Sequence, residues 1–105
     1  MKIAAFALAA AGLVASGAVF AQSAEDLIKK NGCAACHSND KKIVGPAYIE
    51  VAAKYKGDAS APAKLIEKIK KGGQGVWGPV PMPPNPTVSD ADLKTIVTYI
   101  LALKK

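Results

Sequence analysis

Five consecutive residues, Cys33-Ala34-Ala35-Cys36-His37, constrain this chain more than any other part of it. Cys-x-x-Cys-His is the attachment motif of a c-type haem, in which two thiols add across two vinyl groups and the next imidazole reaches the iron. Two intervening residues separate the sulfur atoms enough to reach two edges of one porphyrin. A chain with this motif is expected to fold around a large apolar disc.

The two cysteines also permit two other interpretations. A Cys-x-x-Cys pair forms a redox-active dithiol when it follows a strand in a βαβ unit, and it can be half of a zinc site. A closed zinc site prefers four Cys or His ligands, whereas this chain has two cysteines and one histidine. The segment before Cys33, residues 25–31, does not have the alternating pattern of a strand. The sequence therefore favours haem over the dithiol and over zinc.

The start of the chain has the pattern of a secretory signal peptide. Lys2 supplies a positive charge, an almost wholly apolar stretch follows, and small or apolar residues precede a cleavage position after Ala21. Cleavage after Ala24 is the alternative. An alanine-rich stretch is weakly hydrophobic for a membrane span of about 20 residues, so a retained anchor is the weaker interpretation. We expect a signal peptide at residues 1–21 and an exported domain at residues 22–105.

The charged residues comprise 14 lysines, no arginine and 8 acidic residues, a formal net charge of +6. A basic balance can indicate nucleic-acid binding, but an exported protein is not expected to meet nucleic acid. The lysines are spread along the chain, as on an ordinary solvated surface. The functional alternative is a positive rim that steers an acidic redox partner into transient contact.

Helical periodicity and capping residues predict two short helices in the first half of the exported domain. Ser23 caps the first helix, with Asp26 as its partner, and Gly32 ends it. Pro46 opens the second helix at its first position, where the missing N–H does no harm, and Gly57 ends it.

Two more helices are predicted in the second half. Ser60 caps the third, and Ser89 caps the fourth, which Lys104 and Lys105 close at its negative end. Between them, residues 72–88 contain five of the seven prolines. Proline removes hydrogen-bond donors and fixes φ, so this segment is predicted to form neither helix nor strand.

The proline-rich segment contains Met82, the only methionine after the initiator, away from any helical stripe. A haem iron with histidine on one side needs a second axial ligand to be low-spin, and a soft thioether ligand raises its potential. The flanking Pro81 and Pro83 stiffen the segment, so less entropy is lost when the sulfur is held. Core packing is the alternative role for Met82.

Through these motifs the chain resembles the small bacterial class I c-type cytochromes, close to the cytochrome c-551 type. The resemblance covers nearly all of residues 24–105 and rests on four motifs in a fixed order. The motifs are Gly32-Cys33-Ala34-Ala35-Cys36-His37, Val44-Gly45-Pro46-Ala47-Tyr48, Gly75-Val76-Trp77-Gly78-Pro79 and Pro81-Met82-Pro83-Pro84-Asn85. It implies an all-α class I cytochrome c fold, with about four short helices wrapped around one covalently attached haem.

The resemblance implies one haem c, bound through thioethers from Cys33 and Cys36. It also implies axial ligation of the iron by His37 and Met82. In the family, the carbonyl matching that of Pro46 accepts a hydrogen bond from the other ring N–H of the histidine. Such a bond is the usual means of orienting a metal-bound imidazole.

Three further residues have roles implied by the resemblance. The indole N–H of Trp77 donates to a haem propionate, with simple core filling as the alternative. Lys68 stands where relatives often place an arginine against that propionate, and a lysine supplies the charge without the planar fork. Asn85 matches a residue that contacts the methionine side of the haem.

The implied function is that of a soluble periplasmic electron carrier rather than an enzyme, because two filled axial positions keep substrates from the iron. The expected partners are a membrane cytochrome complex as donor and a terminal reductase or oxidase as acceptor, in weak and rapidly exchanging contacts. We expect a monomer without stable membrane insertion. Three alternatives remain open: a haem peroxidase or gas-binding protein, a thiol–disulfide oxidoreductase, and the haem module of a larger complex.

Overall fold

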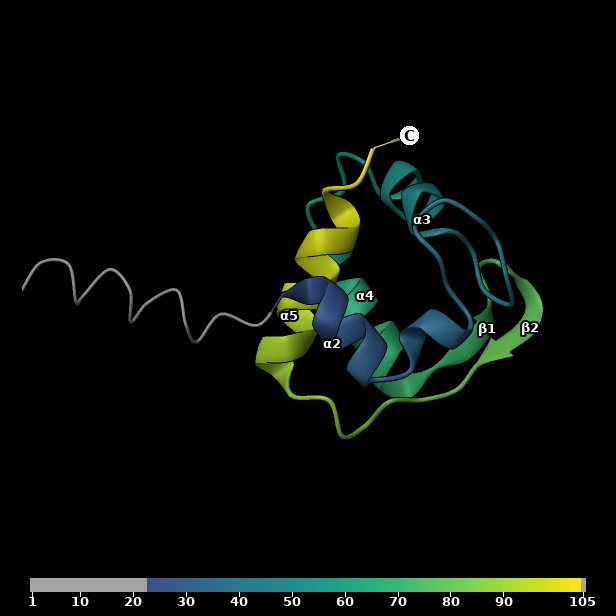
Figure 1. Ribbon diagram of the computed structural model, residues 1–105. Coiled ribbons are helices and arrows are strands. Elements are labelled where there is room, and N and C mark those ends of the chain that lie inside the picture. The colour runs from purple at the N-terminus through teal and green to yellow at the C-terminus, as the bar shows by residue number, and fades with distance from the viewer. Residues whose placement is uncertain (1–22, 105) are drawn as a thin grey trace, which may run out of the picture.

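The computed structural model describes residues 23–104, so the predicted signal peptide lies outside the described residues. The described part is mostly helical, with one short hairpin. Its elements are α2 (Ala24–Lys30), the 3₁₀ helix η1 (Cys33–Ala35), α3 (Tyr48–Lys54), α4 (Ala61–Lys71), β1 (Gly73–Gly75), β2 (Gly78–Met82) and α5 (Asp90–Leu101). Figure 1 shows α2, α4 and α5 gathered on one side of the molecule and the hairpin on the opposite side.

Helices α2 and α5 begin at the serines that the sequence predicts. The Ser23 hydroxyl accepts a hydrogen bond from the N–H of Asp26 at 3.1 Å, and the Ser89 hydroxyl accepts one from the N–H of Asp92 at 3.2 Å. Each bond satisfies an N–H of the first turn that has no partner within its helix. Both predicted caps are therefore confirmed.

Helix α3 begins at Tyr48 rather than at Pro46, so its predicted start was wrong. The N–H groups of Tyr48 and Ile49 donate to the carbonyls of Ser38 and Asn39, at 2.9 and 3.0 Å. These carbonyls supply acceptors outside the helix for its first two donors. The helix starts where this preceding segment can cap it, and the proline remains outside.

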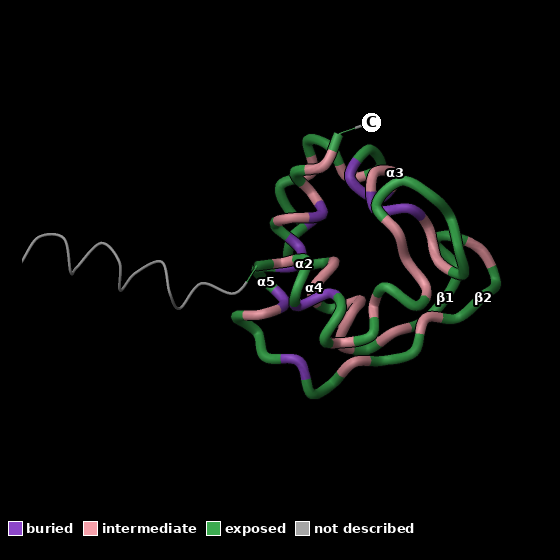
Figure 2. The backbone as a smooth tube through the Cα atoms, in the orientation of Figure 1, coloured by how far each residue is buried: buried purple, intermediate pink, exposed green. Residues whose placement is uncertain are grey.

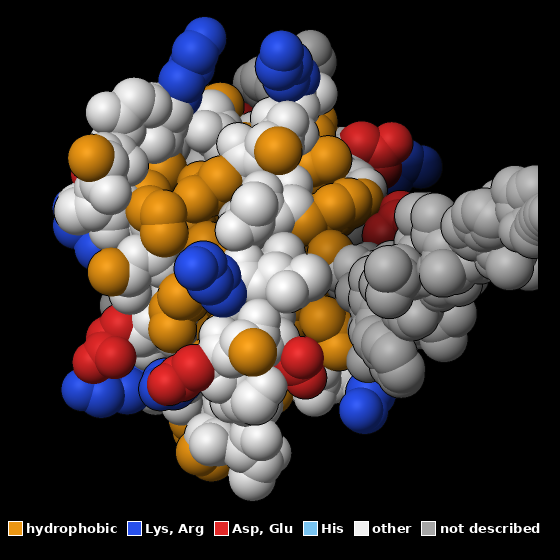
Figure 3. Space-filling model, turned by 90° about the vertical axis from the view of Figure 1, so that its left-hand side faces the viewer, with side chains coloured by type: hydrophobic (Ala, Val, Ile, Leu, Met, Phe, Trp, Pro, Cys, Tyr) orange, Lys and Arg blue, Asp and Glu red, His pale blue; other side chains and the backbone are white. Residues whose placement is uncertain are grey.

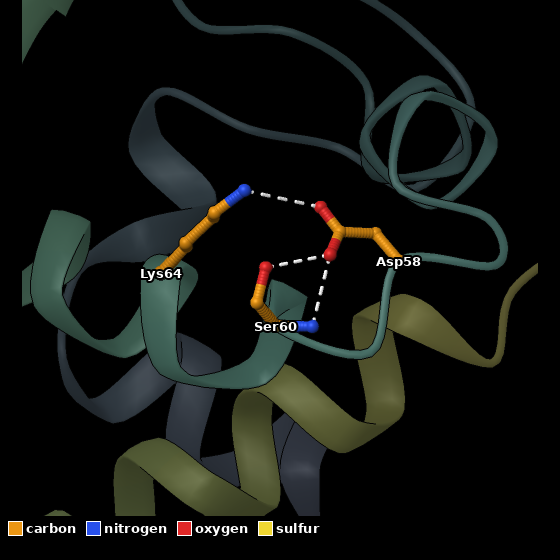
Figure 4. Close-up of polar contacts among 3 residues, drawn as sticks. All are labelled: Asp58, Ser60 and Lys64. Atoms are coloured by element: carbon orange, nitrogen blue, oxygen red, sulfur yellow. Dashed lines mark hydrogen bonds and ion pairs between the residues drawn. The ribbon is translucent and has the colours of Figure 1, made fainter.

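Ser60 precedes α4 but does not cap it, contrary to the prediction. Its backbone is helical, with φ −89° and ψ −2°, whereas a capping residue is normally extended. Its hydroxyl and N–H both donate to Asp58 Oδ1, at 2.6 and 2.9 Å, and Lys64 Nζ lies 3.2 Å from Asp58 Oδ2 (Figure 4). The Ser60 hydrogen bonds, followed by that from Lys64, lower the pKa of the Asp58 carboxyl below its usual range.

The C-terminal end of α5 also differs from the prediction. The helix ends at Leu101, and backbone hydrogen bonds from Ala102 and Leu103 close its last turn. Lys104 lies beyond the helix, and Lys105 is outside the described residues. Backbone N–H groups therefore satisfy the carbonyls of Thr98, Tyr99 and Ile100.

The core forms where α2, α3 and α5 meet, and Figure 2 shows the buried segments on these helices. Its buried cluster consists of Leu27, Ile28, Tyr48, Val51, Ile96 and Ile100. Burying a side chain of this size stabilises the fold by about 1.5–3 kcal/mol. On α4, Ala61 is buried, but the larger side chains of Leu65, Ile66 and Ile69 are only half-buried. Leu65 and Ile69 line a cavity instead.

The prediction that residues 72–88 form no strand was wrong. Strands β1 and β2 pair in antiparallel fashion, with Gly73 opposite Met82 and Gly75 opposite Gly78. The three glycines have φ values between 112° and 123°, which side chains larger than hydrogen rarely allow. Within residues 23–104 the hairpin has no third strand, so β2 has an outer edge of the kind where proline is tolerated.

Each helix within residues 23–104 is too short or too polar to cross a membrane.

Candidate haem-binding site

A cavity of about 620 Å³ lies between the helices and the hairpin. Its volume is within the range of about 300–1,000 Å³ that is typical of ligand pockets. All eight residues predicted for the site line this cavity: Cys33, Cys36, His37, Pro46, Lys68, Trp77, Met82 and Asn85. The structure therefore brings together residues from η1, α4, the hairpin and the loops between them.

The chemistry of the cavity fits a haem. Two thiols, one imidazole and one thioether line it, together with lysine side chains that can meet carboxylates. Apolar side chains from three helices complete the wall, among them Val51, Leu65 and Val97. A haem needs this combination, because it is an apolar disc with an iron at its centre and two propionates at one edge.

The two cysteines are placed by the turn between α2 and η1. Gly32 has φ +76° and allows the chain to leave α2 abruptly. The N–H groups of Cys36 and His37 both donate to the carbonyl of Cys33, at 3.1 and 3.0 Å. Both thiols are half-buried, and burial raises the pKa of the Cys33 thiol. The tight turn keeps both sulfur atoms and the imidazole at one wall of the cavity.

The His37 ring is held by three neighbours. Its Nδ1 lies 2.8 Å from the carbonyl oxygen of Pro46, and its face stacks on Tyr48 with the ring centroids 5.0 Å apart and the planes 17° apart. A Cβ atom added at Gly45 would lie 2.5 Å from His37 Cε1. Because a carbonyl can only accept, Nδ1 is the donor in this contact, and in the neutral ring this leaves the lone pair on Nε2.

Gly45 and Tyr48 are site residues for which the sequence supplied a motif but no role. Both flank Pro46, yet nothing in the sequence indicates that they contact the ring of His37. Burial also raises the pKa of the Tyr48 hydroxyl, so that ring stays neutral beside the imidazole. Gly45 and Tyr48 contact the His37 ring only in the folded structure, where the loop before α3 lies over the turn at η1.

Met82 lies at the end of β2 and is half-buried. A Cβ atom at Gly72 would collide with the carbonyl oxygen of Met82, so only glycine allows this approach. Beyond the methionine, Asn85 donates from its N–H to the carbonyl of Ile69 at 2.9 Å and from Nδ2 to the carbonyl of Pro83 at 3.2 Å. The methionine segment is thus fastened to the C-terminal end of α4.

Trp77 lies in the turn of the hairpin with 41% of its surface exposed, so it is not a core-filling residue in this structure. Lys54 Nζ lies 5.7 Å from the centroid of the Trp77 ring and 5.9 Å from that of Tyr55. These distances allow a cation–π interaction that links α3 to the hairpin. Nothing in the residue pattern indicates the contact between Lys54 and Trp77, because these residues are far apart along the chain.

Comparison with known proteins agrees with this geometry. The family model for cytochrome c matches residues 21–104. Cytochrome c-551 of Pseudomonas aeruginosa is 53% identical over 97 residues, covering 92% of this chain and 91% of that protein. Cytochrome c-552 of Nitrosomonas europaea is 51% identical over 96 residues, covering 91% of each. This chain therefore belongs to the cytochrome c family.

A solved structure shows the same fold. The crystal structure of wild-type Nitrosomonas europaea cytochrome c552 matches with a TM-score of 0.73 and 54% sequence identity, covering 76% of this chain and 99% of that one. The predicted class I cytochrome c fold is confirmed, with a small hairpin added to the four α-helices. Members of this family bind haem c covalently and carry electrons; they are not enzymes. This chain is accordingly a haem c electron-transfer protein.

Proposed function

We propose that this protein is a soluble electron carrier of the periplasm, with one low-spin haem c ligated by histidine and methionine. The observation that carries the proposal is that all eight residues chosen from the sequence line one cavity. In this proposal the exported domain comprises residues 22–105, and residues 1–21 are removed as a signal peptide.

Cys33 and Cys36 would hold the haem through two thioether bonds, and His37 and Met82 would be its axial ligands. When bound, the haem supplies the one-electron couple of its iron. The hydrogen bond from His37 Nδ1 to the Pro46 carbonyl fixes the tautomer whose Nε2 can bind a metal. The thioether of Met82 favours the reduced metal, because it is a soft ligand, and so raises the potential.

Trp77 and Lys68 would meet the propionates from the open side of the cavity. Trp77 is half-exposed in the hairpin turn, where its indole N–H can donate to a carboxylate at the molecular surface. Lys68 is half-buried on α4 and lines the same cavity. Asn85 would act on the methionine side by holding the segment after Met82 against α4.

With His37 and Met82 as permanent ligands, the chain offers substrates no position on the iron, so it would carry electrons and catalyse no bond chemistry. The proposed donor is a membrane cytochrome complex, and the proposed acceptor is a terminal reductase or oxidase. The protein would meet both as a monomer, without inserting into the membrane or binding nucleic acid.

Surface charge supports transient partner contacts. On the face drawn in Figure 3, lysine and acidic side chains are interspersed, with hydrophobic side chains between them. At the cavity, by contrast, the lining includes Lys42, Lys64 and Lys68 with Glu50 as its acidic residue. A positive margin there would steer an acidic redox partner towards the haem edge.

The test is an absorption spectrum of the exported protein, oxidised and reduced, together with its intact mass. We expect sharp α and β bands in the reduced form, a weak near-infrared sulfur–iron band in the oxidised form, and a mass equal to residues 22–105 plus one haem. A bare polypeptide mass would exclude the covalent haem. Rapid binding of carbon monoxide or cyanide at neutral pH would exclude Met82 as a permanent ligand.

A further inference from the structure

We propose that Tyr99 is a positioning residue for the His37 side of the haem site. Its hydroxyl joins the first helix of the described chain to the segment that directly follows His37. The inference rests on the proposed role of His37 as an axial ligand, and it concerns a residue on the last helix, outside the cavity.

The bridge consists of two hydrogen bonds at one phenolic oxygen. Asn39 Nδ2 donates to the Tyr99 hydroxyl at 2.8 Å, and that hydroxyl donates to Glu25 Oε2 at 3.2 Å. The partners are 60 and 74 residues away along the chain. One hydroxyl therefore connects α5, α2 and the segment after the haem-attachment motif.

The segment held by Tyr99 caps the beginning of α3. The carbonyls of Ser38 and Asn39 accept from the N–H groups of Tyr48 and Ile49, at 2.9 and 3.0 Å. No side chain caps this helix within the described residues. A contact that holds Ser38 and Asn39 in place therefore also determines where α3 begins and where the Tyr48 ring lies.

Tyr48 transmits this position to His37. The two rings are stacked with their centroids 5.0 Å apart, and Ser38 is the next residue after His37 in the chain. The position of the His37 ring therefore depends on the segment at Ser38 in two ways: through the backbone that joins them and through the stacked ring of Tyr48. Both routes begin at the segment that Asn39 ties to Tyr99.

The Tyr99 side chain is suited to this role because its two parts have different surroundings. Its ring packs against the core cluster of α2, α3 and α5, while its hydroxyl makes both bonds near the surface. Because the core holds the Tyr99 ring in place, its hydroxyl is a rigidly placed hydrogen-bond acceptor for Asn39. Tyr99→Phe removes the hydroxyl with both of its hydrogen bonds and leaves the packing of the ring in place.

The test compares Tyr99→Phe with Tyr55→Phe in the haem-loaded protein. Tyr55 packs against the same cluster, but its hydroxyl is not part of the Glu25–Tyr99–Asn39 bridge. Tyr99→Phe removes both bonds of the bridge, but only the one from Asn39 holds the segment before α3. We expect amide hydrogen exchange at Tyr48 and Ile49 to become about two- to tenfold faster in Tyr99→Phe, as the loss of that bond implies, and to be unchanged in Tyr55→Phe.

A second readout separates positioning from general stability. In the oxidised protein, the ring-proton NMR signals of His37 should shift in Tyr99→Phe and in Asn39→Ala, and the double variant should shift no further than either single one. Additive shifts, unchanged His37 signals, or a uniform acceleration of exchange throughout the chain would each overturn the proposal.

The two proposals fail in different ways. If His37 does not bind iron, its ring signals in the unmodified protein already lack the large shifts of an iron ligand, before any variant is made. The exchange rates of Tyr48 and Ile49 do not depend on that ligation. A haem-loaded protein with normal His37 signals and no local effect of Tyr99→Phe would refute the role of Tyr99 alone.

Discussion

The His37 side and the Met82 side of the cavity are built from different kinds of contact. On the first side the ring itself is held, by the carbonyl of Pro46, by the face of Tyr48 and by the close approach of Gly45. On the second side the contacts reach the backbone: Gly72 lies against the carbonyl of Met82, and strand pairing holds the same residue.

This difference teaches how a small domain can hold two ligands of unlike stiffness. An imidazole is a rigid plane, so contacts to its face and edge define its position. A methionine side chain has three rotatable bonds, so it can reach a metal once its backbone is fixed nearby. The helical half therefore orients a side chain, while the hairpin half places a segment of backbone.

The largest effect, a change in reduction potential, is expected from Met82→Ala, which removes the proposed axial ligand on the hairpin side of the cavity. Loss of the soft thioether should lower the reduction potential by on the order of 100 mV, within the range of about 0.8 V spanned by axial ligands. Potentiometric titration measures this change. Thr98→Ala, at an exposed position of α5 that does not line the cavity, is the control, and an unchanged potential in Met82→Ala would contradict the ligand assignment.

Gly45→Ala tests the side-chain contacts of the other half. The added Cβ would lie 2.5 Å from the His37 ring, and such overpacking typically costs about 1–3 kcal/mol of unfolding free energy. Denaturant unfolding and the haem spectrum should both change, because the ring must move.

Gly57→Ala is the matched control for that substitution. Gly57 has φ +81° and open space around it, so alanine there costs about 1–2 kcal/mol through backbone strain alone. Its haem spectrum should stay the same. If the two variants gave identical spectra, the contact between Gly45 and His37 would have no influence on the site.

Asn85→Ala tests whether the Asn85 side chain helps to hold the methionine segment. The variant loses the side-chain hydrogen bonds to the carbonyls of Pro83 and Ile69, at 3.2 and 3.5 Å, at a cost of about 1 kcal/mol. The backbone bonds from its N–H to Ile69 and Lys70 remain. The near-infrared sulfur–iron band should weaken. Asn31→Ala loses a similar bond, to the carbonyl of Leu27, and should lose similar stability without any change in that band.

The smallest effect, a change in stability with pH, is expected from Asp58→Asn. Asp58 lies outside both halves of the site. The folded state lowers the pKa of this half-buried carboxyl, chiefly through hydrogen bonds from Ser60 and then through Lys64. Because the folded pKa is below the unfolded one, the ionised carboxylate stabilises the protein above about pH 4. That contribution disappears as the pH falls through the lowered pKa.

Thermal unfolding measured at several pH values tests whether the ionised form of Asp58 is the stabilising one. The melting temperature of the unmodified protein should exceed that of Asp58→Asn slightly at pH 7, and the two should converge in acid. A difference that grew as the pH fell would show that the carboxylate is not the stabilising form.

Local patterns predicted the parts of the fold that depend on neighbouring residues. Ser23 and Ser89 cap their helices because a serine side chain needs only the N–H three residues later. Ser60 is also a serine directly before a helix, but its hydroxyl donates a hydrogen bond to Asp58 and does not cap the helix. The hairpin was missed because its pairing depends on glycines with positive φ, which leave no alternating apolar pattern.

The sequence by itself predicted which groups would bind the haem, because a Cys-x-x-Cys-His motif and a single internal methionine leave few alternatives. It also determined the family, which the comparisons confirm. Only the tertiary structure decided how these groups are held. Gly45, Tyr48 and Tyr99 gain their roles from contacts between segments that fold together, and such contacts depend on packing across the molecule rather than on residue type or spacing.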